Sequence, residues 1–273
     1  METILNDASG IENEALFNAI KAKVHPIMSR FRQSISEKAA SQAKDIGYIV
    51  NDDIKDLNFL RFFPSLKSLN INSKRLNDIS GIRHITDTTS IFLTGGWEGG
   101  VDISVLSNCR ELEELEITSY AEETKKPRDM QIRGLSVLEG LLKLWSIELC
   151  HMGISDIGFV KRLTKLEDIG FEGNPISDIT PLEGHPSLEM LDLNSCKITD
   201  ISVLSTIRNL EFLDISGNQI KDFSPLKGLA KLEDVYASDN GLTPEEIAHW
   251  ENELQHIDTL EFYEDDYDDE YDD

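Results

Sequence analysis

The chain has 273 residues, of which 51 are acidic and 26 basic, so its formal net charge at pH 7 is 26 − 51 = −25. A charge this negative repels a phosphate backbone, which argues against nucleic acid as a partner and favours a basic protein. Apolar residues make up 40% of the chain. That fraction excludes wholesale disorder, and the length suits one large domain or two small ones.

We expect no targeting signal from the first residues of the sequence. Residues 1–7 contain no positively charged region and no apolar run of signal length, and no later segment reaches the length of a membrane span. Cys109, Cys150 and Cys196 are widely spaced and form no CxxC pair, which favours reduced thiols over disulfides or a zinc site. We therefore expect a cytoplasmic protein that does not contact a membrane.

Residues 1–55 are predicted to form a helical N-terminal cap. Leu16 and Ile20 have helical spacing within a first helix over 11–24. After a proline, the apolar stripe resumes into a second helix through Ile27, Met28, Phe31 and Ile35. Residues 46–54 are predicted to be a degenerate first strand.

The segment 56–243 contains eight copies of one pattern, mostly at intervals of 22 residues. The copies open at Asp56, Asp78, Asp102, Gly134, Asp156, Asp178, Asp200 and Asp222. Two intervals are longer because of insertions at 95–100 and 120–131. Counted from the opening residue, positions two, five, eleven, fourteen and sixteen are apolar in nearly every copy. This spacing predicts short strands with one buried side.

Most copies approach the pattern Leu-x-x-Leu-x-Leu-x-x-Asn, as in Leu210-Glu-Phe-Leu-Asp-Ile-Ser-Gly-Asn218. The asparagine position, which is position nineteen, is filled by Asn174, Asn218, Asn240 and, as a substitute, Cys196. An asparagine amide there is expected to satisfy backbone groups in the turn after the strand. In the first four copies Lys74, Gly96, Tyr120 and Met152 stand at or near this position, which predicts less regular turns.

The pattern resembles the leucine-rich repeat, specifically the 22-residue class of bacterial internalins and of a eukaryotic type-1 phosphatase regulator. The resemblance covers residues 56–243 and implies an α/β solenoid, because one repeat cannot bury its own apolar side chains and must stack on its neighbours. A curved parallel sheet is expected on the concave side, and short 3₁₀ or irregular segments on the convex side. In this family partners usually dock on the concave sheet.

Residues 244–263 are predicted to form a C-terminal cap made of a helix and a strand. Thr243-Pro-Glu-Glu246 has the pattern of a capping box with proline at the first helical position. The inward stripe of the helix consists of Ile247, Trp250 and Leu254. A closing strand follows over 259–263.

Residues 264–273 carry eight carboxylates and are predicted to be a disordered acidic tail. Without them the net charge is −25 + 8 = −17, so the rest of the chain is acidic in its own right. The tail is either a solubilising extension or a feature that steers a basic partner.

Positions twelve, thirteen, fifteen and seventeen of each repeat are expected to be exposed on the concave sheet. In the last six repeats, thirteen of these twenty-four residues are acidic and none is basic, whereas the first two repeats carry no carboxylate there. The candidate partner-binding residues among them are Glu114, Glu116, Trp145, Glu148, Asp168, Glu172, Met190, Asp192, Phe212, Asp214, Asp234 and Tyr236.

Two interpretations of this acidic surface are open. Strands lie about 4.8 Å apart, so Glu116 should neighbour Glu148, and Asp192 should neighbour Asp214, and such like-charge pairs oppose sheet stability. The surface is then either a soluble covering for exposed strand positions or a docking surface for a basic protein. Large apolar residues among the charges favour docking.

The two insertions are secondary candidates for partner contact, because insertions in solenoids tend to lie on binding faces. Trp97, in the insertion at 95–100, is either an exposed binding residue or a side chain that folds back to fill an irregular turn. The insertion at 120–131 is treated as a second contact loop.

We expect no catalytic centre, no cofactor and no metal site. The histidines are scattered, and His151 beside Cys150 lacks an identifiable third catalytic partner, so Cys150 is interpreted as simply exposed. His185 stands at position eight, which is otherwise apolar, and is interpreted as a semi-buried structural residue. The ligand spacing of an EF-hand is absent.

The sequence thus favours a non-enzymatic, cytoplasmic binding module that is monomeric when free and docks a basic protein. The most economical role is an inhibitor or immunity protein that neutralises a toxin or effector enzyme, since carboxylates accelerate association with a basic target. The alternatives are an adaptor or regulatory subunit similar to the phosphatase regulator, and a structural scaffold.

Overall fold

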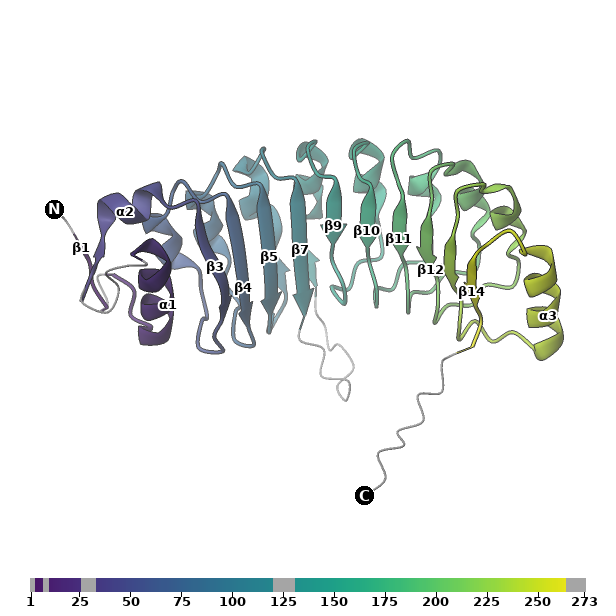
Figure 1. Ribbon diagram of the computed structural model, residues 1–273, viewed down its shortest axis with the longest axis horizontal. Helices are drawn as coiled ribbons and strands as arrows, with labels where there is room; N and C mark the ends of the chain where they lie inside the picture. The colour runs from purple at the N-terminus through teal and green to yellow at the C-terminus, as the bar shows by residue number, and fades with distance from the viewer. Residues whose placement is uncertain (1–2, 7–9, 26–32, 120–130, 264–273) are drawn as a thin grey trace, which may run out of the picture. The chain divides into compact units, whose positions relative to one another are not determined.

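The computed structural model describes residues 3–6, 10–25, 33–119 and 131–263. The chain divides into two compact units. Unit 1 consists of residues 1–154 and 158–166, and unit 2 of residues 155–157 and 167–273. Both units are built from the same strand, turn and 3₁₀-helix repeat (Figure 1).

The main sheet of unit 1 is parallel and follows the repeat order. Its strands are β3 (Asp45–Val50), β4 (Ser68–Ser73), β5 (Ser90–Gly95), β7 (Glu114–Ser119) and β9 (Ser146–Glu148). Leu69 pairs with Ile91 and Ile91 with Leu115, in the register that the leucine positions predict. These side chains are at most 1% exposed. The buried side of the sheet is therefore set by the repeat pattern.

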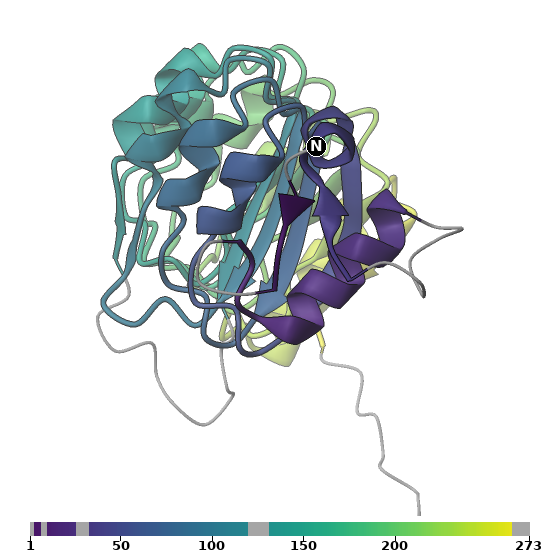
Figure 2. The same cartoon turned by 90° about the vertical axis from the view of Figure 1, so that its left-hand side faces the viewer.

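The N-terminal part of unit 1 adds two helices and two short paired strands. These are β1 (Thr3–Ile4), α1 (Glu14–Val24), β2 (Ile35–Ser36) and α2 (Glu37–Gln42). Figure 2 shows α1 lying against the end of the sheet beside β3. The predicted second helix falls partly on residues 26–32, outside the described residues. Its last member, Ile35, is not helical, because it pairs antiparallel with Ile4 in β2 and the helix starts two residues later.

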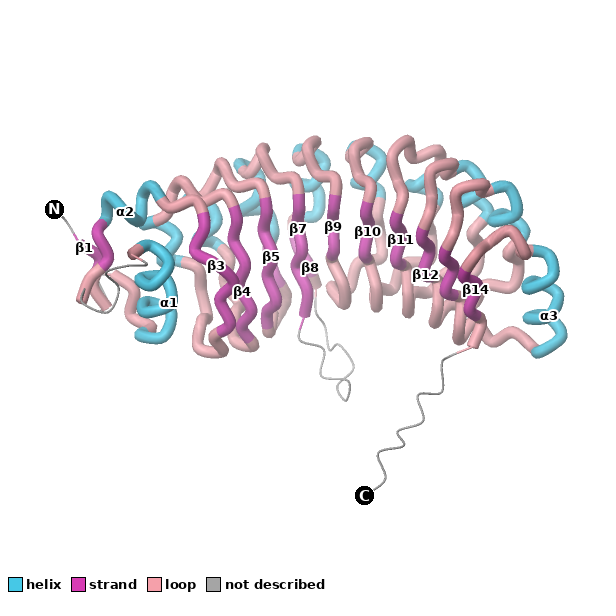
Figure 3. The backbone as a smooth tube through the Cα atoms, in the orientation of Figure 1, coloured by secondary structure: helices cyan, strands magenta, loops and turns pink. Residues whose placement is uncertain are grey.

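A second small sheet of unit 1 joins β6 (Val101–Asp102) and β8 (Ile132–Arg133) in parallel. The 3₁₀ helices of unit 1 are η1 (Asn58–Phe62), η2 (Ser80–His84), η3 (Ile103–Asn108), η4 (Leu135–Gly140) and η5 (Gly158–Arg162). In Figure 3 the cyan helical turns lie on the other side of the repeats from the magenta strands.

Unit 2 repeats this plan with shorter strands. Its parallel strands are β10 (Asp168–Gly170), β11 (Met190–Asp192), β12 (Phe212–Asp214), β13 (Asp234–Tyr236) and β14 (Thr259–Glu261). Its 3₁₀ helices are η6 (Thr180–Leu182), η7 (Ser202–Thr206) and η8 (Ser224–Gly228). The helix α3 (Pro244–Glu253) begins with the predicted capping box, in which the Thr243 hydroxyl accepts from the Glu246 N–H and the Glu246 carboxylate accepts from the Thr243 N–H. Trp250 packs against Phe223, with ring centroids 5.7 Å apart.

The aspartates that open the repeats close a hydrogen-bonded turn at the start of the 3₁₀ helices, and Asp102 is itself the N-cap of η3. Their Oδ1 atoms accept from the backbone N–H two residues later, at 2.8–2.9 Å, in Asp56, Asp78, Asp102, Asp178, Asp200 and Asp222. Hydrogen bonds from Ser224 lower the pKa of Asp222 below its ordinary value of 3.8, and Ser202 does the same for Asp200. The opening aspartate is therefore explained by the turn that it stabilises.

The asparagine position behaves as predicted in unit 2. Asn218 Nδ2 donates to the carbonyls of Leu193, Ile215 and Ser216 at 2.9–3.0 Å, and its Oδ1 accepts from the Ile198 N–H at 2.9 Å. Asn240 makes the equivalent set of bonds one repeat later. Each amide thus links two consecutive turns, which are buried and would otherwise leave backbone groups unsatisfied.

Cys196 occupies the same position with a weaker bond. Its Sγ lies 3.6 Å from the Phe171 carbonyl, and burial raises the pKa of its thiol to about 11. The neighbouring repeat position holds a left-handed backbone, with φ of 54° at Ser195 and 65° at Gly217.

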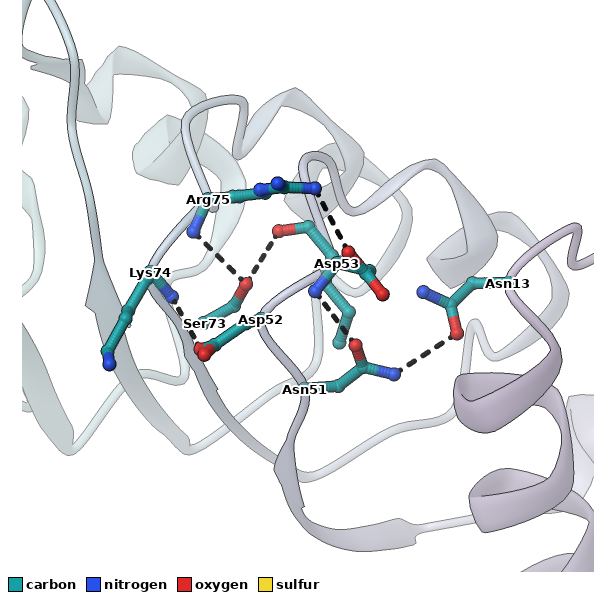
Figure 4. A network of polar contacts seen from close by, with 8 residues as sticks. Asn13, Asn51, Asp52, Asp53, Ser73, Lys74 and Arg75 are labelled. Carbon is teal, nitrogen blue, oxygen red and sulfur yellow. Dashed lines mark hydrogen bonds and ion pairs between the residues drawn. The ribbon is translucent and has the colours of Figure 1, made fainter.

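Unit 1 replaces this asparagine ladder with a polar network near its first repeat, shown in Figure 4. The Ser73 hydroxyl donates to the Ile54 carbonyl at 2.8 Å and accepts from the Arg75 N–H. Asn51 Nδ2 donates to Asn13 Oδ1, and Asn13 also caps α1. The less regular turns expected at the start of the repeats are therefore stabilised by individual contacts.

The parallel sheets, the 3₁₀ turns and the few α-helices confirm the predicted leucine-rich-repeat solenoid fold. Residues 120–130 and 264–273, which include most of the predicted second insertion and the acidic tail, lie outside the described residues. Across the described ranges, none of the helices combines the length and apolar character needed to span a bilayer.

We predict that Asn218→Ala lowers the free energy of unfolding by about 3 kcal/mol, because several buried backbone groups lose their partner at once. Asn252→Ala, on the exposed surface of α3, is the control and should change it by less than about 0.5 kcal/mol. Urea unfolding followed by circular dichroism measures both. Equal stability of the two variants would contradict the stabilising role of the asparagine hydrogen bonds.

A second prediction concerns the aspartate turns that precede the 3₁₀ helices. Asp222→Ala should cost about 1 kcal/mol at pH 7 because the Ser224 N–H loses its acceptor, whereas Asp222→Asn keeps an acceptor and should cost less. Because the folded pKa of Asp222 is depressed, its contribution is complete above 3.8 and is lost as the pH falls through the folded value. Urea unfolding at neutral and at acid pH should show that the difference in unfolding free energy between the wild type and Asp222→Ala is smaller at acid pH.

Candidate protein-binding faces on the strands

The strand face of unit 2 consists of the side chains of β10–β14 that point away from the core. Its first row runs through Asp168, Met190, Phe212, Asp234 and Thr259, and its second through Gly170, Asp192, Asp214, Tyr236 and Glu261. Apart from Gly170, which is buried, all of these residues are at least partly exposed. The predicted neighbours Asp192 and Asp214 do lie directly opposite each other.

Two of these carboxylates also have a structural role. Asp192 Oδ1 accepts from the Asn194 N–H at 2.8 Å, and Asp214 Oδ1 accepts from the Ser216 N–H at 2.9 Å. Asp234 has no such bond. Within the described residues neither Asp214 nor Asp234 forms an ion pair, whereas Glu211 at the rim lies 3.8 Å from Lys231 Nζ. The negative charges of Asp214 and Asp234 are therefore not neutralised by a basic side chain among the described residues.

Apolar side chains lie between these charges. Met190 is 46% exposed and stands beside Phe212 in the first row. The rings of Phe212 and Tyr236 have centroids 5.6 Å apart and are tilted by 41°. A patch of large apolar residues surrounded by charges has the composition of an interface centre and rim.

The strand face of unit 1 changes character along the sheet. Its central row runs through Tyr48, Asn70, Phe92, Glu116 and Glu148. Glu116 and Glu148 are opposite each other as predicted, and burial raises the pKa of Glu116 above its usual range. Trp145, just before β9, is 39% exposed, and Glu114 is partly exposed in the adjacent row. The acidic part of this face therefore carries a desolvation cost.

The interpretation of Trp97 as an exposed binding residue is wrong. Its side chain is 0% exposed and its Nε1 donates to the Thr118 carbonyl at 2.7 Å. The ring packs against Gly95, where a Cβ would lie 2.5 Å from it. Of the two interpretations, the side chain that fills an irregular turn is the correct one.

Cys150 is a second correction, because it is 6% exposed and not a surface residue. Its Sγ lies 3.6 Å from Glu148 Oε1. His151 has φ of 59° and stands at the repeat position that is left-handed in later repeats, where Gly173 and Gly217 occur. The turn explains its place without a catalytic role. Ser216, also predicted to be exposed, is 7% exposed.

Tyr48 and Val50 were missed by the repeat pattern although each is 62% exposed on β3. The register of β3 against β4 shifts between Asp45 and Tyr48, next to Gly47 with φ of 77°, so the alternation differs from that of the other strands. The apolar residues at 46 and 49 were a usable signal, because the positions between and after them must face outwards.

Two observations bear on metal and thiol chemistry in the described residues. Among them, no group of three or more His, Cys, Asp or Glu side chains is placed to hold a metal ion. Burial raises the pKa of Cys109 to about 11, which disfavours the reactive thiolate.

Comparison with known proteins agrees with the fold. A family model described as leucine-rich repeats in two copies matches residues 164–208 and 186–228. No curated protein matches the chain in sequence.

The solved structures with similar folds include internalin C2 of Listeria monocytogenes, with a TM-score of 0.69 and 22% identity, over 83% of this chain and 94% of that one. The internalin InlF of the same species has a TM-score of 0.59 and 19% identity, over 93% and 89% of the two chains. The plant peptide hormone receptor RGFR1, in complex with RGF2, has a TM-score of 0.53 and 14% identity, over 76% of this chain and 38% of the receptor. At these identities the likeness shows the leucine-rich-repeat fold.

The desolvated charge at Glu116 gives a third prediction. Glu116→Gln should raise the free energy of unfolding at pH 7 by about 0.5 kcal/mol, since it removes a like-charge pair across the strands. Because the folded pKa of Glu116 is raised, the charged carboxylate destabilises the wild-type fold, and the protonated one does not. The stability advantage of Glu116→Gln should therefore disappear as the pH falls below the ordinary pKa of 4.5. Urea unfolding at both pH values, with the exposed Glu139→Gln as control, tests this.

Proposed function

We propose that this leucine-rich-repeat protein is a cytoplasmic, non-enzymatic binding module whose acidic strand faces dock a basic protein, as an inhibitor or immunity protein that neutralises a toxin or effector enzyme. The observation that carries the proposal is the centre of the unit 2 strand face, where carboxylates stand among the exposed Met190 and the Phe212–Tyr236 ring pair. Among the described residues, two of these carboxylates, Asp214 and Asp234, form no ion pair. Solenoid repeats commonly use their extended strand surfaces for binding.

Stability alone does not account for these charges. Asp192 opposite Asp214, and Glu116 opposite Glu148, are like-charge cross-strand pairs, each of which opposes folding by up to about 1 kcal/mol. Serine or asparagine would be equally soluble at these positions without this cost. A basic partner would relieve the repulsion, and its own charge would be attracted from a distance.

Inhibition is favoured because both the net charge and the local surface are acidic. A strongly acidic protein binds a basic enzyme quickly, and speed matters when a toxin must be neutralised before it acts. An exposed apolar centre then slows dissociation. The reduced state expected for the cysteines fits a cytoplasmic location.

An adaptor or regulatory subunit, similar to the phosphatase regulator that the repeat class resembles, would use the same face without blocking an active site. A structural scaffold would need none of the uncompensated charge. An adjacent reading frame that encodes a large secreted effector would favour the immunity role over the adaptor.

The decisive experiment compares two variants that each remove four negative charges. The strand-face variant carries Glu116→Gln, Glu148→Gln, Asp192→Asn and Asp214→Asn, and the new amides keep the side-chain oxygens that accept from Asn194 and Ser216. The control variant carries exposed changes away from the strand faces, namely Glu139→Gln, Glu183→Gln, Glu251→Gln and Asp258→Asn. Both should remain folded by circular dichroism.

In pull-downs from the native cell extract, we expect wild type and control to retain one basic protein at low salt and the strand-face variant to lose it. Adding the wild-type protein should then suppress the activity of the captured protein. If the strand-face variant loses binding but the wild-type protein does not change the activity of the captured protein, the adaptor role is favoured over inhibition. Equal capture by the two variants would leave the acidic strand faces as a soluble covering.

A further inference from the structure

The centre of the unit 2 strand face has an alternating pattern of aromatic and acidic side chains. On the neighbouring strands β12 and β13, Phe212 is opposite Asp234, and Asp214 is opposite Tyr236. The two aromatic residues therefore occupy one diagonal of a four-residue square, and the two aspartates occupy the other. We call these four residues the aromatic–acidic square.

The square brings together the two groups that recognise a guanidinium. An arginine side chain stacks its flat face on an aromatic ring and donates forked hydrogen bonds from its edge to carboxylates. With strands about 4.8 Å apart, both aspartates lie beside the rings. The Phe212 and Tyr236 centroids are 5.6 Å apart, and all four residues are partly exposed, so the ring surfaces are available from solvent.

One of the two carboxylates, that of Asp214, is already held in position for such a ligand. Asp214 is held by the Ser216 N–H at 2.9 Å and by Asn194 Nδ2 at 3.4 Å, which fixes its orientation. Within the described part of the chain, neither Asp214 nor Asp234 has a cation of its own. Met190 continues the apolar row beside Phe212 and offers a surface for the methylene stem of a long side chain.

A lysine fits this arrangement less well. Its ammonium is a compact, strongly hydrated charge that gains from the carboxylates but cannot stack as a plane on the rings. A face built only to attract positive charge would need no aromatic diagonal. The partner's recognised group is therefore expected to be specific in shape as well as in charge.

We propose that the aromatic–acidic square is the receptor for an arginine side chain on the basic partner. This inference rests on the proposed function and specifies the residue type that the partner must present.

The test uses the full chain and two peptides, acetyl-(Gly-Arg)₄-amide and acetyl-(Gly-Lys)₄-amide, which have equal charge and length. Isothermal titration at low salt should give a Kd about fivefold lower for the arginine peptide, the difference expected of a cation–π contact. Phe212→Leu and Tyr236→Leu keep an apolar side chain but remove a ring, and each should bring the two Kd values together by weakening only the arginine peptide. Asp234→Asn should weaken both peptides.

Tyr48→Leu is the matched control, since it removes an exposed aromatic ring from the neutral part of the unit 1 strand face and should preserve the arginine preference. Equal Kd values of the two peptides for the wild type would overturn the arginine receptor while leaving a charge-driven docking face intact. A preference that persists in both ring variants would also overturn it. If neither peptide binds the wild type at low salt, both the receptor and the acidic docking face are wrong.

Discussion

A single 22-residue repeat cannot bury its own apolar side chains, and the core and the turns of this chain follow from the need to stack. Stacking buries the strand leucines, but it also buries the turn that follows each strand. In unit 2 the side-chain amides of Asn218 and Asn240 solve that second problem by bonding to backbone groups of two consecutive turns. The core and the turn are thus fixed together, and the opening aspartates fix the 3₁₀ segment between them.

The leucines, asparagines and aspartates of the repeat are fixed by the core and the turns, so the outward strand positions are the ones that can vary. Their composition is consequently the most informative part of the molecule about function. The half-buried Glu116 has a raised pKa, and Asp192 lies opposite Asp214. These charges therefore lower the stability of the folded state. One oxygen of Asp214 nevertheless supports its own turn through Ser216, so a residue can serve the repeat and the surface at once. Within the part of the chain that the structure describes, Asp234 makes no such turn bond, so it is the strongest candidate for a surface role.

Periodic features could be predicted from the sequence because they depend on contacts that recur every repeat. The strand register and the asparagine bonds belong to this group. The capping box of α3 is not periodic, but it depends on four consecutive residues and could be predicted from that local motif. The failures lie where the period breaks. Trp97 is buried because a non-periodic turn leaves a space beside Gly95, and Ile35 is a strand residue because it meets Ile4, thirty-one positions earlier. Tyr48 became exposed through a local shift in register next to Gly47.

Charge and shape act at different distances on a partner that approaches these faces. At physiological salt the attraction extends over a Debye length of about 8 Å, and it does not distinguish one basic protein from another. A cell contains many basic proteins, so the inhibitor role that we propose requires a second, short-range criterion. The alternation of Phe212 and Tyr236 with Asp214 and Asp234 supplies one, because stacking and forked hydrogen bonding are satisfied together only by a planar cation. On this account the net charge sets the rate of encounter, and the aromatic–acidic square sets which encounters last.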